Sequence, residues 1–70
     1  MFYEVCIETM NRSYQSVAVC AASKREAARI ARNYRAVRND IDPVVYTRRI
    51  GEYEYYGITE RPHYNDCFAD

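Results

Sequence analysis

Apolar and polar residues alternate along residues 2–10 and again along residues 14–22, which is the pattern of two half-buried strands. The polar residues 11–13 between them favour a turn. With a three-residue loop, apolar residues would pair across the hairpin: Ile7 with Val17, Val5 with Val19 and Tyr3 with Ala21. All six would share one face, and a slip of one residue would turn one strand's apolar side chains to solvent. We therefore expect an antiparallel hairpin with one apolar face.

Residues 23–39 predict an amphipathic helix. Ser23 and Glu26 form a capping box, in which the serine hydroxyl accepts a hydrogen bond from the backbone N–H of Glu26. Asn39 and Asp40 should end the helix. Its apolar stripe, expected to pack on the apolar face of the hairpin, has helical spacing and consists of Ala27, Ile30, Ala31, Tyr34 and Val37.

A second hairpin is predicted from residues 44–50 and 52–58, opened by Pro43 and turning at Gly51 and Glu52, so that Arg49 would face Glu54. Residues 59–70 form a polar C-terminal tail, with a short strand predicted at 64–68. The order strand-strand-helix-strand-strand predicts one small α+β domain over residues 1–70. Its antiparallel sheet would have four to five strands, with one amphipathic helix packed on one face.

The sheet face away from the helix is also predicted to be apolar. Cys6, Ala18 and Cys20 would lie on it. The second hairpin would add one of two sets of side chains, either Tyr46, Tyr53 and Tyr55 or Tyr56 and Ile58. Because such a face is too apolar for exposure, we expect the tail, a second copy of the chain in a homodimer, or a target to cover it.

Size and charge place the function on the surface. A chain of 70 residues forms one small core without a deep substrate cavity. The chain is formally neutral, but residues 23–39 hold six basic residues and one acidic residue, a net charge of +5, and the remainder carries −5. The eight tyrosines are suited to a contact surface, because their rigid rings have a polar tip. The charge separation and the tyrosines together favour a binding protein.

No pattern in the chain indicates catalysis, a cofactor or a metal. The only histidine, His63, has no nucleophile or orienting group at a recognisable spacing. Gly51 and Gly57 do not form a phosphate-binding loop. The three cysteines have the spacing of neither a zinc site nor a disulfide framework, so we expect reduced thiols. We predict a protein that is not an enzyme, with no catalytic, cofactor or metal-binding residues.

The sequence also predicts a cytoplasmic protein that does not contact a membrane. No positively charged leader precedes an apolar run, and the longest apolar stretch, residues 17–22, is far shorter than the roughly 20 residues that span a bilayer.

The exposed side of the predicted helix carries a basic ridge formed by Arg25, Arg29 and Arg32. Such a ridge can neutralise phosphates while tyrosines stack on bases, which would make a nucleic-acid-binding module. The nine acidic residues elsewhere would repel the nucleic-acid backbone. Solubility alone, or a protein partner with an acidic patch, also explains the ridge.

Several residues resemble those of small bacteriophage anti-CRISPR proteins, in particular a type I-F inhibitor of similar length. The matching residues are Ala22-Ser23, Glu26-Ala27, Arg29-Ile30-Ala31 and Asp66-Cys67. The resemblance implies a non-enzymatic inhibitor that docks on a CRISPR RNA-guided surveillance complex and competes with DNA for its Lys/Arg-rich surface. It also implies acidic contacts, with tyrosines as anchors.

We therefore predict a small phage or mobile-element protein that inhibits a host protein assembly in the host cell cytoplasm. The predicted protein-binding residues are Glu4, Glu8, Glu52, Glu54, Tyr53, Tyr55 and Tyr56. The alternative is a nucleic-acid-binding module that uses Arg25, Arg29 and Arg32, and the third hypothesis is a homo-oligomer.

Overall fold

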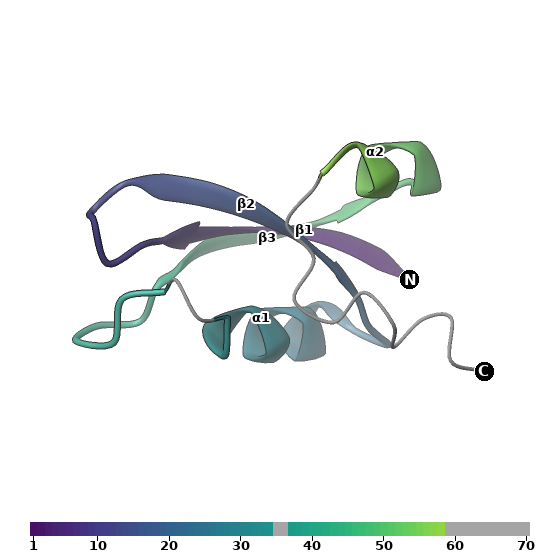
Figure 1. Cartoon of the computed structure of the whole chain (residues 1–70). Helices are drawn as coiled ribbons and strands as arrows, with labels where there is room; N and C mark the ends of the chain where they lie inside the picture. The colour runs from purple at the N-terminus through teal and green to yellow at the C-terminus, as the bar shows by residue number, and fades with distance from the viewer. Residues whose placement is uncertain (35–36, 59–70) are drawn as a thin grey trace.

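The computed structural model describes residues 1–34 and 37–58. These residues form a three-stranded antiparallel sheet with one helix on each face (Figure 1). The elements follow one another as β1 (Phe2–Glu8), β2 (Tyr14–Cys20), α1 (Lys24–Arg32), β3 (Val44–Ile50) and α2 (Glu52–Gly57). The α+β class and the antiparallel sheet are confirmed, but the described residues contain three strands and two helices instead of four to five strands and one helix. The tail 59–70, with the strand expected at 64–68, lies outside the described residues.

The β1–β2 hairpin forms with a register two residues away from the predicted one. Val5 lies opposite Val17, not opposite Val19. The turn lies one residue earlier than expected, over residues 10–12, because Thr9 closes it: its backbone N–H donates to the Ser13 carbonyl at 2.9 Å, and the two hydroxyls lie 2.9 Å apart. A shift of two residues keeps every side chain on its predicted face, since side chains alternate along a strand. The predicted core face therefore survives the error in register.

Helix α1 begins where predicted and ends earlier. Ser23 precedes it, and its Oγ accepts a hydrogen bond from the Glu26 N–H at 3.1 Å. Asn33 caps the C-terminal end, so the predicted end at Asn39 is wrong. The chain then returns to the sheet, where Val37 forms an isolated antiparallel bridge just beyond β1. The return to the sheet replaces the last turns expected for the helix.

The main core lies between α1 and the sheet. Its buried residues come from β1, β2, α1 and the residue after β2, and are Tyr3, Val5, Ile7, Val17, Val19, Ala21, Ala27, Ile30 and Ala31. Alanines in the helix allow it to approach the sheet closely, and Tyr34 and Val37 pack against the margin of the core. The predicted apolar stripe therefore packs as expected, although its last two members lie beyond the helix.

The predicted second hairpin does not form. β3 pairs with β1, which becomes the central strand of the order β2-β1-β3. Arg49 therefore lies opposite Tyr3, and its predicted pairing with Glu54 is wrong. The segment after Gly51 is helical, and the Tyr55 N–H donates to the Gly51 carbonyl at 3.0 Å. Because this segment is a helix on the sheet face, Tyr55 packs onto the sheet. A strand paired along the outer edge of β3 would not bring Tyr55 to that position.

Helix α2 covers one end of the sheet face that lies opposite α1 (Figure 1). Tyr55 is fully buried there against Ala18 and Ile50, and Phe2, Cys20 and Ile58 pack around this small core. The prediction that this face is apolar is confirmed at the end under α2 only, because Glu4, Ser16 and Arg48 lie on the same face and bond to one another. Its cover at this end is α2, which the sequence pattern did not indicate.

Candidate protein-binding surface

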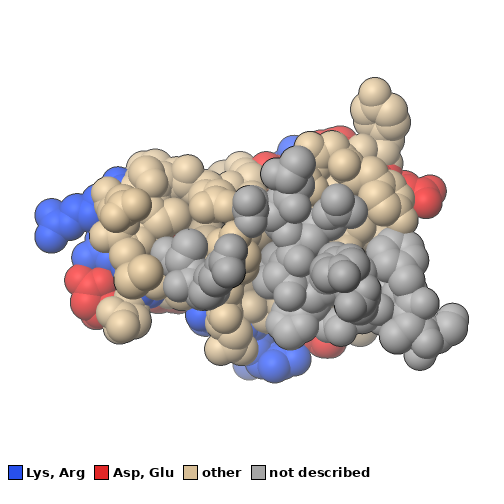
Figure 2. Space-filling view, in the orientation of Figure 1, with Lys and Arg blue, Asp and Glu red and all other residues tan. Residues whose placement is uncertain are grey.

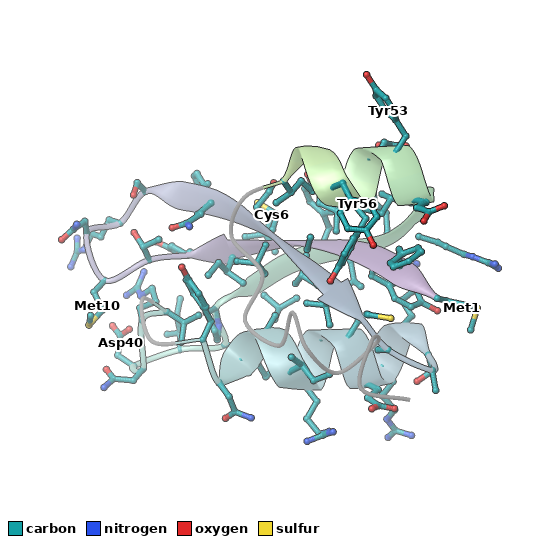
Figure 3. The ribbon with its side chains drawn as sticks, turned by 45° about the vertical axis from the view of Figure 1, so that its right-hand side comes forward. Met1, Cys6, Met10, Asp40, Tyr53 and Tyr56 are labelled. Carbon is teal, nitrogen blue, oxygen red and sulfur yellow. The ribbon has the colours of Figure 1, made fainter. Side chains whose placement is uncertain are left out.

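The outer side of α2 combines exposed tyrosines with carboxylates. Tyr53 is 94% exposed, and its side chain points away from the sheet (Figure 3). Tyr56 is 45% exposed and lies one helical turn further along. Glu52, Tyr53, Tyr56 and Gly57 line a shallow open depression. We call the residues Glu52, Tyr53, Glu54 and Tyr56 the α2 face.

Gly57 leaves room beside the two exposed tyrosine rings. Apart from its chain neighbours and the backbone of α2, no described atom lies within 4 Å of where a Cβ on Gly57 would be. Because residues four apart lie on the same side of a helix, this space is next to Tyr53. A side chain from a partner therefore has access to both tyrosines.

Tyr55 faces the opposite way and is a core residue. Its ring centroid lies 4.4 Å from that of Phe2 and 5.2 Å from that of Tyr56, the latter in an edge-to-face arrangement. Its side chain has no exposed area, so it is not accessible to a partner. Tyr55 holds α2 on the sheet and thereby positions the exposed tyrosines on either side of it in the sequence.

Arg48 joins two of the predicted acidic contacts. Its Nε donates to Glu4, and its Nη2 donates to Glu54 Oε2 at 2.9 Å. The Ser16 hydroxyl donates to Glu4 at 2.7 Å. These bonds, the one from Ser16 first, lower the pKa of Glu4 against the opposing effect of its burial. Glu4, whose side chain is 12% exposed, therefore stabilises the sheet and ties it through Arg48 to α2.

Glu8 lies at the other end of β1 and is also engaged. The Arg38 guanidinium donates to Glu8 at 2.7 Å and makes two further hydrogen bonds to Asp40. The hydrogen bonds from Arg38 lower the pKa of Asp40 to about 2. The structure therefore does not bring the four predicted glutamates together: Glu52 and Glu54 lie on α2, whereas Glu8 holds the segment after α1.

The basic ridge on α1 is partly neutralised. Arg32 makes two hydrogen bonds of 3.1 Å to the Asp42 carboxylate. Arg32 and the Val44 N–H lower the pKa of that carboxyl. Arg29 lies 3.9 Å from Glu26, and both Arg29 and Arg25 are exposed. In Figure 2, Lys and Arg atoms lie on the lower edge, where α1 runs, and acidic atoms lie beside α2.

The described residues contain no group of three or more His, Cys, Asp and Glu side chains that could hold a metal ion. Cys6 is a free thiol whose pKa is raised by burial and by the charge of Glu4. Cys20 is disulfide-bonded, so the expectation of reduced thiols is wrong for this residue. His63 and Cys67 lie outside the described residues. Of the helices in residues 1–34 and 37–58, neither has the length and apolar character needed to cross a membrane.

The sequence did not single out Arg48 or Gly57 as parts of this surface. Arg48 lies opposite Glu4 only because β3 pairs with β1, and Gly57 lies beside Tyr53 only because the segment is a helix. Comparison with protein-family models, with curated proteins and with solved structures finds no match for the chain. The α2 face must therefore be interpreted from its own chemistry.

Proposed function

We propose that the protein is a non-enzymatic binding protein that docks its α2 face on a Lys/Arg-rich surface of a larger protein assembly. The observation that carries the proposal is the exposure of Tyr53, 94%, on a helix that also carries Glu52 and Glu54. A tyrosine ring binds with little loss of conformational entropy and stacks on guanidinium groups. Carboxylates beside it favour a basic partner and speed the encounter.

A basic surface of this kind is what a nucleic-acid-processing assembly uses to hold the phosphate backbone. A protein with an acidic and aromatic face that occupies this surface excludes DNA without any chemistry of its own. The resemblance to phage anti-CRISPR inhibitors makes a CRISPR RNA-guided surveillance complex in the host cytoplasm the first partner to test.

The test mixes the full chain with a purified type I-F surveillance complex and follows co-migration by size exclusion and DNA binding by gel shift. We expect co-migration and loss of DNA binding. Tyr53→Ala should weaken the complex about 30-fold or more, as expected for a central interface anchor. Tyr14→Ala, which removes another exposed tyrosine far from α2, should leave the affinity unchanged.

Two results would count against the proposal. Absence of co-migration would remove this complex as the partner. Equal effects of Tyr53→Ala and Tyr14→Ala would remove the α2 face as the contact, whatever the partner.

The second candidate function is nucleic-acid binding by α1. It is favoured by the exposure of Lys24, Arg25 and Arg29, none of which has a carboxylate partner closer than 3.9 Å among the described residues. The neutralisation of Arg32 by Asp42 weakens this alternative.

A further inference from the structure

β3 is an edge strand with backbone groups directed away from the sheet. Met1 and Ala21 exchange two hydrogen bonds, and in an antiparallel ladder such pairs recur at every second residue. Odd-numbered residues of β1 therefore bond to β2, and even-numbered residues bond to β3. Glu4 is one of the latter, and its backbone groups face its partner on β3, Arg48. It follows that the N–H and C=O groups of Thr47 and Arg49 point to the open edge. No backbone hydrogen bond from the described part of the chain reaches them.

The exposed side chains along this edge are apolar at one end of β3 and basic at the other. Val45 is 53% and Tyr46 45% exposed at one end of the strand, and Arg49 is exposed at the other. Arg49 has no ion pair within residues 1–34 and 37–58, in contrast to Arg48. The bulge that often protects an edge strand is confined here to the first residues of β3, where the register shifts between Cys6 and Ile7.

Helix α1 places further positive charge beside this edge. Arg32 reaches Asp42, which lies just before β3, so the C-terminal end of α1 lies near the start of β3. Arg29 and Arg25 lie three and seven residues before Arg32 and therefore share its side of the helix. Arg49 lies on the same face of the sheet as α1, because it pairs with Tyr3 of the main core.

We propose that the β3 edge binds an extended acidic segment of a protein partner as an added strand. Thr47 and Arg49 would supply the backbone hydrogen bonds, and side chains at every second position of the segment would lie beside Arg49, on the face of the sheet where Arg25 and Arg29 make α1 positive. The intervening side chains would lie on the face that carries Tyr46. A second copy of the chain is the poorer occupant, because pairing two β3 edges would bring two basic α1 helices side by side.

The probe is a capped eight-residue peptide in which Glu alternates with Val and Thr. We expect it to slow hydrogen exchange at the amides of Thr47 and Arg49 by at least tenfold. The Arg48 amide should not respond, because it already faces β1. A peptide of the same composition with its glutamates in adjacent pairs, and an alternating peptide with Lys in place of Glu, should bind at least tenfold more weakly.

Two variants test the backbone and the charge separately. Thr47→Pro removes an N–H that faces the open edge. An edge strand accepts proline at such a position, because no hydrogen bond within the sheet is lost, so the variant should fold but no longer bind the peptide. Arg49→Glu changes an exposed residue and should weaken binding of the Glu peptide at least tenfold, which reduces its advantage over the Lys peptide. Tyr53→Ala, which disables the proposed α2 contact, should leave peptide binding unchanged, so the two surfaces can fail independently.

Three results would overturn the proposal: unchanged exchange at Thr47 and Arg49, equal binding of the Glu and Lys peptides, or slowed exchange on α2 instead of β3. A doubling of the mass without peptide, together with protection of the same two amides, would overturn it too, because a second copy would then occupy the edge.

Discussion

At the scale of single residues, Ser23 decides where α1 begins. Its Oγ accepts from the Glu26 N–H, one of the first-turn donors that have no partner within the helix. We expect Ser23→Ala to lower the free energy of unfolding by about 1 kcal/mol. Ser23→Asp keeps a hydrogen-bond acceptor, so its free energy of unfolding should stay close to that of the parent. Urea denaturation measures both, and equal stability of the alanine variant and the parent would contradict this role.

Asp40 should give the fold part of its acid sensitivity. Its pKa is lowered by Arg38 to about 2 in the folded state, against about 3.9 in the unfolded chain. Its stabilising contribution is therefore fully present above about pH 4 and is lost as the pH falls toward about 2, because only the unfolded state takes up the proton in that range.

We expect Asp40→Asn to reduce the loss of stability between about pH 5 and about pH 2.5. Part of the loss should remain, because the pKa values of Glu4 and Asp42 are also lowered. The Asp40 side chain is 61% exposed, so added salt should shrink the difference between variant and parent. Urea titrations at both pH values measure this, and an unchanged pH dependence would show that the pair contributes nothing.

At the scale of elements, two tyrosines of α2 that lie two residues apart have opposite roles. Tyr55 is fully buried, so Tyr55→Ala should cost about 3–5 kcal/mol of unfolding free energy, the range for removing a large buried aromatic side chain. Tyr53 is 94% exposed, and Tyr53→Ala should change stability by less than about 0.5 kcal/mol. Chemical denaturation of the two variants compares them directly, and a similar cost at both positions would mean that α2 is packed differently.

The elements also show which parts of the fold the sequence could predict. The alternation in β1 and β2 and the capping box at Ser23 predicted the sheet face and the start of α1, because these signals are local. The register slipped by two residues, because the bonds between Thr9 and Ser13 depend on side-chain geometry in the turn.

The strand predicted after Gly51 was wrong for a different reason. Its tyrosines favour a strand by local propensity. Burial of Tyr55 against Phe2, Ala18 and Ile50 depends on tertiary structure, because only the pairing of β3 with β1 brings Ile50 and α2 beside the hairpin. For the candidate site, the sequence therefore identified Tyr53, Tyr56, Glu52 and Glu54 as residue types. It could not separate them from the buried Tyr55 or from Glu4 and Glu8, which are engaged in the sheet.

At the scale of the whole molecule, a formally neutral chain places exposed arginines of α1 and carboxylates of α2 on opposite faces of one sheet. α1 with Arg25 and Arg29 lies on one face, and α2 with Glu52 and Glu54 lies on the other. Such a molecule approaches a basic surface with α2 leading, because the potential of the two faces differs in sign. The proposed function and nucleic-acid binding by α1 therefore make opposite predictions for the same substitution.

The double variant Arg25→Gln and Arg29→Gln separates the two functions. Removing two positive charges makes the chain net negative, so binding to a basic assembly should be unchanged or tighter at low salt and equal to the parent at high salt. Nucleic-acid binding by α1 predicts the reverse, a weaker complex. The slope of log K against log salt concentration should also be shallower by about 0.9 for each phosphate that α1 no longer neutralises. Titrating parent and variant against both ligands at several salt concentrations measures the difference. Weaker binding to the protein assembly would show that α1, and not the α2 face, makes the contact.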